Sequence, residues 1–263
     1  MTDQNSDGTE RFQILHAFAD HAVESEVLAT VGTVTRWTQD PQPNPHVSET
    51  VTVDLMEDVP SGRFNLAVLH PRCTDESDMT SISGDPDDHE NQIPRAREIA
   101  KQVAEDYVIE NKPRDDLRDP TALHGRMFGL PLAYERAFET TFPVQSPARH
   151  QPLGEKTVTP YYYSDRTREW WAATKGYRGD YPKQHLAKNA LPAAYVHCLV
   201  RSWLESLDTR DAEVPQDNNQ PAPPKVPNDQ TTLVQSDGGR NSRSVDTGTN
   251  QNDPNPDAGG GSR

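Results

Sequence analysis

Long apolar runs are absent from this sequence, and cysteine is scarce. Only 32% of the 263 residues are hydrophobic, and no run approaches the roughly 18 consecutive apolar residues of a membrane span. Residues 1–11 are polar and acidic, unlike a secretory signal peptide. Cys73 and Cys198 are too few for a disulfide framework or a cysteine zinc site. We therefore expect a cytoplasmic protein of a reducing interior, with no membrane partner.

Lysine is scarce as well. The chain has 7 lysines beside 19 arginines, and its 41 acidic residues give a net charge of -15. A strongly acidic surface of this kind suits a protein that stays soluble in very high salt. We therefore expect a haloarchaeal cell, or a virus that infects one, as the source. An ordinary acidic cytosolic protein is the alternative.

Large aliphatic residues are few in the C-terminal part of the chain. The segment 208–263 cannot bury enough apolar surface to offset its ordering entropy, so we predict a disordered, acidic and polar tail there. Residues 10–207 are long enough for one domain with its own core. Strands are predicted over 12–18, 47–55, 64–69 and 107–109, and helices over 93–105 and 191–207. This order of elements, in which strands alternate with a long crossover and a helix, indicates a Rossmann-like α/β fold. Such a fold has a mostly parallel sheet with helices on both faces.

Two predicted strands end in reactive side chains. The strand 64–69 leads into Cys73, and the strand 107–109 leads into Glu110. Ligands of such sheets gather at the carboxyl ends of strands, so the thiol and the carboxylate could face one substrate. His70 and Arg72 would supply positive charge that favours a nucleophilic thiolate. Alternatively, Cys73 is an incidental loop thiol and Glu110 a helix cap or surface carboxylate.

Several short motifs follow one another in a distinctive order. Upstream stands Phe64-Asn-Leu-Ala-Val-Leu-His-Pro-Arg-Cys73, and downstream Leu191-Pro-Ala-Ala-Tyr195. Between them stand Tyr107-Val-Ile-Glu-Asn111, Leu117-Arg-Asp-Pro120, Leu123-His-Gly-Arg-Met-Phe-Gly-Leu130 and Glu135-Arg-Ala-Phe-Glu-Thr140. Their order and spacing resemble the small phage-type DNA (cytosine-5) methyltransferases over residues 64–143. The resemblance is looser over 12–60 and 185–205.

The resemblance implies a defined reaction on double-stranded DNA. Cys73 would add to C6 of a cytosine, and the activated C5 would take a methyl group from S-adenosylmethionine. Glu110 would contact N3 and the exocyclic amine of the base, and Arg136 would help to hold the base or the cysteine loop. The base must leave the duplex first, because its reactive face is otherwise stacked. We expect a monomeric enzyme.

The donor-binding segment departs from the family pattern. The family has Asp-Leu-Phe-x-Gly-x-Gly-Gly where this chain has Leu15-His-Ala-Phe-Ala-Asp-His-Ala22. Phe18 is kept, but every glycine is replaced, and a β-carbon should obstruct the close approach of the cofactor. Asp40 and Asp54 could match the acids beside the ribose and the adenine. Alternatively, each is a turn or strand-end carboxylate.

The catalytic strand end departs too. Non-family residues stand around Cys73 and Glu110, namely Arg72, Thr74, Lys112, His124, Arg126 and Tyr134. These changes leave two outcomes open. Either the chain is a divergent but working methyltransferase, or it is a degenerate homologue that keeps the fold and binds DNA or protein without turnover.

A short target-recognition-like insertion is expected over about 144–185. Aromatic and basic residues alternate there, and four basic side chains could grip phosphates: Arg166, Arg168, Lys175 and Arg178. Alternatively, Trp170 and Trp171 pack in a core. No metal site is expected, because His70 and His89 lack ligand-like partners. The spacing of His197 and Cys198 in the last helix favours packing over metal ligation.

Overall fold

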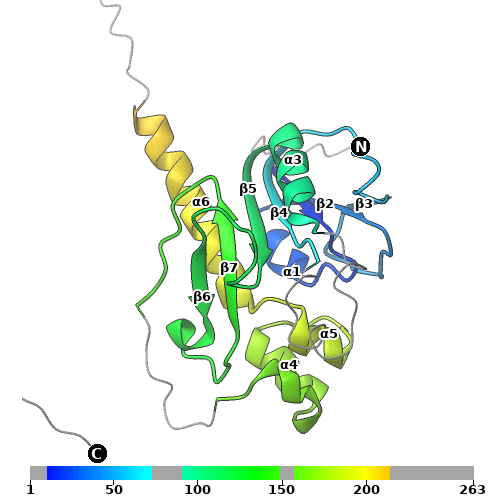
Figure 1. Ribbon diagram of the computed structural model, residues 1–263, viewed down its shortest axis with the longest axis vertical. Helices are drawn as coiled ribbons and strands as arrows, with labels where there is room; N and C mark the ends of the chain where they lie inside the picture. The colour runs from blue at the N-terminus through cyan, green and yellow to red at the C-terminus, as the bar shows by residue number, and fades with distance from the viewer. Residues whose placement is uncertain (1–10, 73–90, 149–156, 214–263) are drawn as a thin grey trace, which may run out of the picture. The chain divides into compact units, whose positions relative to one another are not determined.

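The computed structural model describes residues 11–72, 91–148 and 157–213 (Figure 1). Within these ranges the chain forms a seven-stranded sheet in the order β3-β2-β1-β4-β5-β7-β6. The strands are β1 (Phe12–Ala17), β2 (Gly32–Thr38), β3 (Glu49–Thr52), β4 (Phe64–Leu69), β5 (Ala104–Asn111), β6 (Thr121–His124) and β7 (Glu135–Thr140). Strands β1 to β5 pair in parallel, and β7 is antiparallel to both β5 and β6. This is the doubly wound order with one antiparallel strand inserted.

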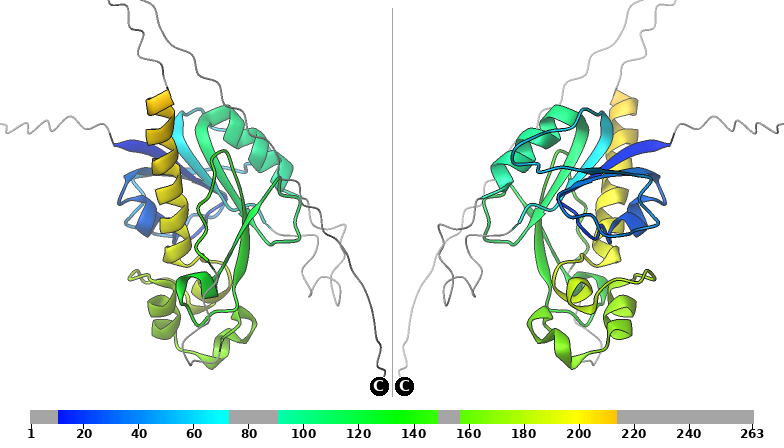
Figure 2. Two further views of the ribbon diagram at one scale, coloured as in Figure 1. Left: turned by 90° about the vertical axis from the view of Figure 1, so that its left-hand side faces the viewer. Right: turned by 90° about the vertical axis from the view of Figure 1, so that its right-hand side faces the viewer.

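Helices cover both faces of the sheet (Figure 2). The helices are α1 (Ser25–Leu28), α3 (Ile93–Val103), α4 (Arg168–Lys175), α5 (Lys183–Lys188) and α6 (Ala193–Glu213), with 3₁₀ turns η2 (Gly125–Phe128) and η3 (Pro160–Asp165). Side chains of α1 and α6 pack on one face, and those of α3 pack on the other. The predicted Rossmann-like fold is therefore confirmed, and the strand order is that of the methyltransferase fold.

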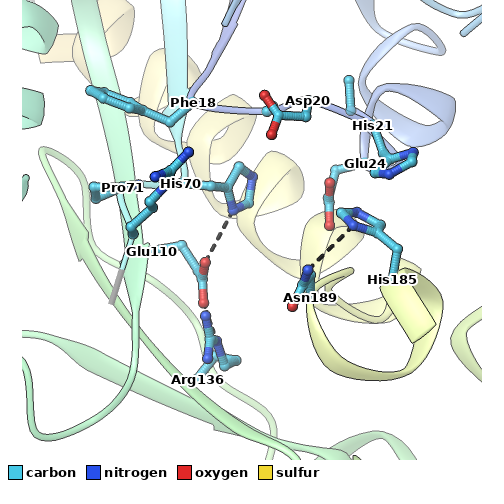
Figure 3. A pocket seen from close by; sticks show the side chains of 13 residues that line it. Phe18, Asp20, His21, Glu24, His70, Pro71, Glu110, Arg136, His185 and Asn189 are labelled. Atoms are coloured by element: carbon cyan, nitrogen blue, oxygen red, sulfur yellow. Dashed lines mark hydrogen bonds and ion pairs between the residues drawn. The ribbon is translucent and has the colours of Figure 1, made fainter. Parts of the chain in front are cut away.

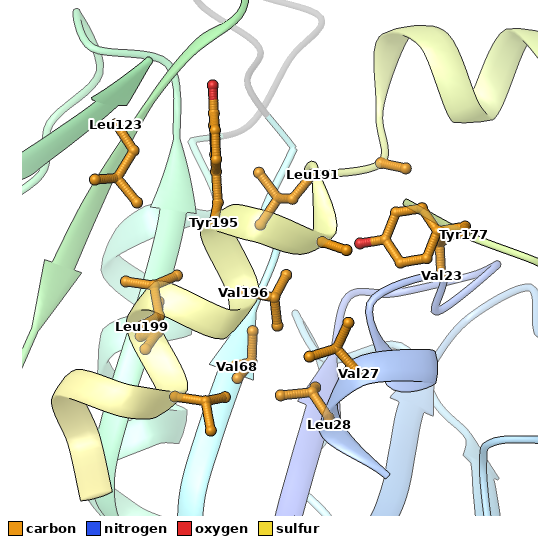
Figure 4. Packing of buried hydrophobic residues seen from close by; sticks show 14 of the residues in the cluster. Val23, Val27, Leu28, Val68, Leu123, Tyr177, Leu191, Tyr195, Val196 and Leu199 are labelled. Atoms are coloured by element: carbon orange, nitrogen blue, oxygen red, sulfur yellow. The ribbon is translucent and has the colours of Figure 1, made fainter. Parts of the chain in front are cut away.

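The larger core lies between α6, α1 and the sheet (Figure 4). Val196 and Leu199 of α6 pack in the same cluster as Leu28 of α1 and Val68 of β4. Successive residues of a strand point to opposite faces, so Leu69 joins the second cluster, under α3. Both faces of the central strands are thus buried, as expected for a parallel sheet.

Local sequence explains where the helices begin and end. In α3, Pro94 occupies the first turn, and the Asn91 side chain accepts a hydrogen bond from the amide of Ile93. In α4, the Thr167 hydroxyl accepts from the amide of Trp170, and Gly176 ends the helix with φ of 84°. Gly176 suits that position because the left-handed conformation costs glycine little.

The structure extends and corrects the predicted elements. Strand β2 was not expected, β5 is longer than 107–109, and β3 is shorter than 47–55. Helix α6 continues to Glu213, so residues 208–213, predicted as tail, belong to the last helix. The rest of the predicted tail, 214–263, lies outside the described residues. Among the helices of the described ranges, none is both long and apolar enough to cross a membrane.

A buried ion pair links β7 to α3 and to the loop after β5. Arg97 donates from Nε and from one Nη to the two carboxylate oxygens of Glu139, each at 2.7 Å. Glu139 also accepts from the amide of Arg118 at 2.9 Å and from the Tyr107 hydroxyl at 3.3 Å. Burial would raise the pKa of Glu139, but these bonds outweigh it and lower the pKa. The motif Leu117-Arg-Asp-Pro120 is thereby anchored to the sheet.

We expect Glu139→Gln to lower the free energy of unfolding by about 1.5–3 kcal/mol at neutral pH, because hydrogen bonds to charged groups are lost. Since the pKa of Glu139 is lowered in the folded state, its contribution is present above the unfolded value of 4.5 and is lost as pH falls below it. Urea unfolding at a series of pH values measures this. Glu98→Gln, which removes the exposed partner of Arg95, should change little.

Candidate active site

A pocket of about 540 Å³ opens at the carboxyl ends of β1, β4 and β5 (Figure 3). It lies where the strand order reverses between β1 and β4, the position at which such sheets bind ligands. Its volume falls in the range of small-molecule sites. Helix α5 closes one side. The lining residues are Phe18, Ala19, Asp20, His21, Ala22, Glu24, His70, Pro71, Arg72, Glu110, Arg136, His185 and Asn189.

Three side chains from three strand ends converge on one wall of this pocket. Glu110 of β5 lies between Arg136 of β7 and His70, which directly follows β4 (Figure 3). Arg136 donates from Nε to Oε1 of Glu110, and His70 Nδ1 lies 3.0 Å from Oε2. The Glu110 side chain is only 3% exposed. The alternative of a surface carboxylate is therefore wrong. Glu110 and Arg136, each predicted as a site residue, are in direct contact.

Electrostatics in this group keeps Glu110 ionised. Burial would raise the pKa of Glu110, but the Arg136 charge and the His70 hydrogen bond outweigh it and lower the pKa to about 2. Burial would likewise lower the pKa of His70, but Glu110 and Glu24 raise it overall. The carboxylate is thus a permanent hydrogen-bond acceptor, and the proton of the pair resides on His70.

The loop after β1 forms the opposite wall and is held in a strained conformation. Phe18 and Ala22 have φ of 56° and 47°, values that residues other than glycine seldom adopt. The amide of Phe18 donates to Trp37 O, and Asn44 Nδ2 donates to the Ala22 carbonyl at 2.8 Å. Arg36 donates to Asp20 O at 2.8 Å. These contacts hold the loop in the conformation that glycines would adopt freely.

A smaller cavity of about 50 Å³ lies beside the main pocket, and Phe18, Asp20 and Arg72 line both. Asp54 also lines it, and its carboxylate accepts from the amide of Met56 and from Gln39 Nε2. Asp40, the predicted ribose-side acid, is exposed and lines neither cavity. Phe18 and Asp54 therefore border the smaller cavity, the side on which the nucleoside of the donor is expected, and Asp40 does not.

The residues present fit S-adenosylmethionine in part. An aromatic ring and a carboxylate border the smaller cavity, and the ionised Glu110 and the carboxylates Asp20 and Glu24 line the larger one, which suits a cationic sulfonium. The left-handed conformations at Phe18 and Ala22 preserve the backbone course expected of a glycine-rich turn. Phe18 and Asp54 are the residues that would hold the donor.

The predicted phosphate contacts differ in their surroundings. Lys175 is buried, and its ammonium donates to the carbonyls of Ala187 and Ala190 and lies 3.9 Å from the centre of the Tyr134 ring. This placement contradicts a phosphate contact by Lys175. Arg168 donates to the carboxylate of Asp180 and to the backbone carbonyls of Gly179 and Tyr181. Arg166 and Arg178 are exposed.

Trp171 is fully buried, so this ring packs in the core, as the alternative to a nucleic-acid contact predicted. Trp170 is partly exposed beside Arg166. The predicted nucleophile Cys73 lies outside the described residues and stays a prediction. Arg72, its neighbour in the chain, lines both cavities.

Sequence reasoning missed several histidines around the pocket. The rings of His21 and His185 lie with centres 4.1 Å apart and planes tilted by 47°, on the α5 side. Burial lowers the pKa of His185 to about 3, and the nearby His21 ring contributes to the shift in the same direction. Glu24 lines the pocket, and His16, which is buried behind it, lies with Nε2 3.7 Å from Glu24 Oε2. No spacing motif joins these residues. His16 and His21 fall in the donor segment 15–22, whereas Glu24 and His185 lie outside it and carry no sequence signal.

Comparisons with known proteins find only distant likeness. No family model matches the sequence, and no curated protein matches it. A protein of an E. coli prophage described as a DNA modification methyltransferase is 12% identical over 54% of this chain and 52% of that chain, with a TM-score of 0.38. The Entamoeba histolytica methyltransferase EhMeth is 11% identical over 75% of this chain and 99% of that chain, with a TM-score of 0.45.

This chain spans about half the length of the first of these proteins. Thermoplasma acidophilum 1320 is 11% identical over 51% of this chain and 81% of that chain, with a TM-score of 0.32. Likeness of this degree carries no argument about activity. The order and direction of the strands give the chain its Rossmann-like methyltransferase fold.

Proposed function

We propose that this protein transfers a methyl group from S-adenosylmethionine to C5 of cytosine in DNA. The observation that carries the proposal is the buried group of Glu110, Arg136 and His70, which faces a pocket at the switch point of the sheet. All three side chains stand in motifs whose order and spacing resemble the cytosine-5 family. When bound, S-adenosylmethionine supplies an electrophilic methyl group.

The chain's own residues have defined tasks in this reaction. Glu110, held ionised, accepts a hydrogen bond from the exocyclic amine of an extruded cytosine. Arg136 fixes the carboxylate in place, and His70 holds the proton next to it. Cys73, three residues after His70 in the chain, is the proposed nucleophile. The proposal therefore assigns base binding to one pocket wall and covalent attack to the segment that follows β4.

Incubating the full chain with duplex DNA and S-adenosylmethionine in high salt, followed by bisulfite sequencing, tests the proposal. We expect methylated cytosines with the wild-type protein and none with Cys73→Ser, because the hydroxyl is a far weaker nucleophile. Cys198→Ser is the matched control, since this thiol lies in α6, with its Sγ 3.4 Å from Gln145 O. Calorimetry should detect donor binding by both variants. Donor binding without methylation in the wild type would contradict the proposal.

A second candidate function is DNA binding without turnover, by a degenerate homologue. Tyr161 and Tyr162 in η3 are 69% and 58% exposed, although large aromatic side chains are usually covered. Arg166 lies nearby, with its guanidinium 5.2 Å from the centre of the Trp170 ring. Exposed rings and a guanidinium in one short segment suit stacking of an unpaired base and contact with a phosphate.

We expect the double variant Tyr161→Ala/Tyr162→Ala to weaken binding of single-stranded DNA by about tenfold or more, because stacking on each ring contributes about 1–3 kcal/mol. Fluorescence anisotropy with a labelled oligonucleotide measures this at several salt concentrations. The control is Tyr163→Ala, which removes the ring that Lys183 and Lys188 approach. Equal loss in both variants would indicate general damage to η3 and count against stacking.

A further inference from the structure

Two histidines and a glutamate lie together at the wall of the pocket, with His16 and Glu24 buried and His70 partly buried. His16 comes from β1, Glu24 from the residue before α1, and His70 from the end of β4. One potential ligand atom from each lies within 4.8 Å of the other two. His16 Nε2 and Glu24 Oε2 are 3.7 Å apart. In a tetrahedral zinc site, ligand atoms stand about 3.3 Å apart, so small side-chain movements would complete such a site.

The other polar atom of each side chain is already anchored. His16 Nδ1 lies 2.8 Å from the Ser25 hydroxyl, and His70 Nδ1 lies 3.0 Å from Glu110 Oε2. Glu24 Oε1 accepts from the amide of Leu191 at 2.7 Å. Metal-binding histidines almost always use their second nitrogen in this way, because the bond fixes the tautomer and the ring orientation. The second shell of a metal site is therefore present.

The inward atoms lack hydrogen bonds. Among the described residues, no group forms a hydrogen bond with His16 Nε2 or His70 Nε2, although both atoms are buried. His16 is completely buried, and the His70 side chain is 14% exposed. A buried polar atom without a partner is costly, and two that face the same carboxylate point to a missing ligand. A divalent cation would satisfy both nitrogens and the carboxylate at once.

We propose that His16, Glu24 and His70 bind one divalent first-row transition metal ion, such as Zn²⁺. Two imidazole nitrogens and one carboxylate oxygen form a donor set used by zinc and by non-haem iron(II). Glu24 and His70 line the pocket while His16 lies behind them, so the remaining coordination position faces the pocket. Water or a carboxylate of a ligand could occupy that position. The inference does not rest on the proposed methyl transfer.

Zinc titration of the chelator-treated full chain by calorimetry tests the proposal without methyl donor or DNA. We expect about one zinc ion per chain, and affinity at least roughly tenfold weaker in His70→Asn and in Glu24→Gln. Glu24→Gln keeps an acceptor for the Leu191 amide, so it removes the charged ligand with little change in packing. His197→Asn, on the exposed side of α6, should bind zinc as the wild type does.

Two further measurements separate this site from its neighbours. His21→Asn and His185→Asn remove the other histidines of the pocket, and we expect both to retain zinc. Substituted Co²⁺ should show visible bands without an intense thiolate band in the near ultraviolet, since the set contains no sulfur. The proposal is overturned if the wild type binds no zinc at about 100 μM, or if Glu24→Gln and His70→Asn bind it normally. A thiolate band, or zinc lost only with His21 or His185, also overturns it.

Discussion

Replacing Arg136 by methionine is expected to lower the free energy of unfolding by about 3–5 kcal/mol. The Arg136 guanidinium contacts the carboxylate of Glu110, whose side chain is 3% exposed. Methionine fills a similar volume but leaves the carboxylate buried, with the His70 ring as its remaining side-chain hydrogen-bond partner. The loss is large because the uncompensated charge stays in the interior. Urea unfolding followed by circular dichroism measures it.

A double-mutant cycle assigns this loss to the ion pair. Glu110→Gln removes the buried charge, so Arg136→Met should cost less in that background than in the wild type. Arg201→Met is the matched control, since its 63% exposed side chain pairs with Glu205 on the surface of α6. Exposed pairs contribute about 0–1 kcal/mol. Equal losses for Arg136→Met in both backgrounds would show that the pair does not account for the effect.

Glu110→Gln is expected to reduce the rate of cytosine methylation by about 10²–10³-fold, the usual effect of losing one preorganised electrostatic contact to the reacting group. The glutamine amide retains the shape of the side chain. It loses the negative charge that strengthens the hydrogen bond from the exocyclic amine of the base and that balances Arg136. Donor binding should persist, because Phe18 and Asp54 border a different part of the site and the carboxylates Asp20 and Glu24 still line the pocket. Single-turnover methylation with saturating donor separates the chemical step from binding.

The control for this experiment is Glu135→Gln, an exposed carboxylate next to Arg136 on β7. We expect its methylation rate to equal that of the wild type. A Glu110→Gln variant that methylates at the wild-type rate would remove Glu110 from the reaction. A variant that no longer binds the donor would instead indicate that Glu110 supports the whole pocket.

Part of the site could be predicted from the sequence because its residues follow regular strands. β4 is a compact apolar run, and His70 directly follows it, so its place at the sheet edge was predictable. Glu110 and Arg136 were found through short motifs, and the pairing of β5 with β7 brings them together. Strand β2 was missed because buried polar residues, Thr35 and Arg36, interrupt its apolar pattern.

The sequence by itself determined the fold class, the acidic character of the protein and the carboxylate at the end of β5. Only the tertiary structure decided that Lys175 is buried and that His16, Glu24 and His70 meet. The physical reason is that a buried polar side chain depends on partners that are remote in the chain. Backbone carbonyls of α5 and its following turn surround Lys175, and two separate strands supply the histidines. No local pattern of apolar and polar residues encodes such contacts.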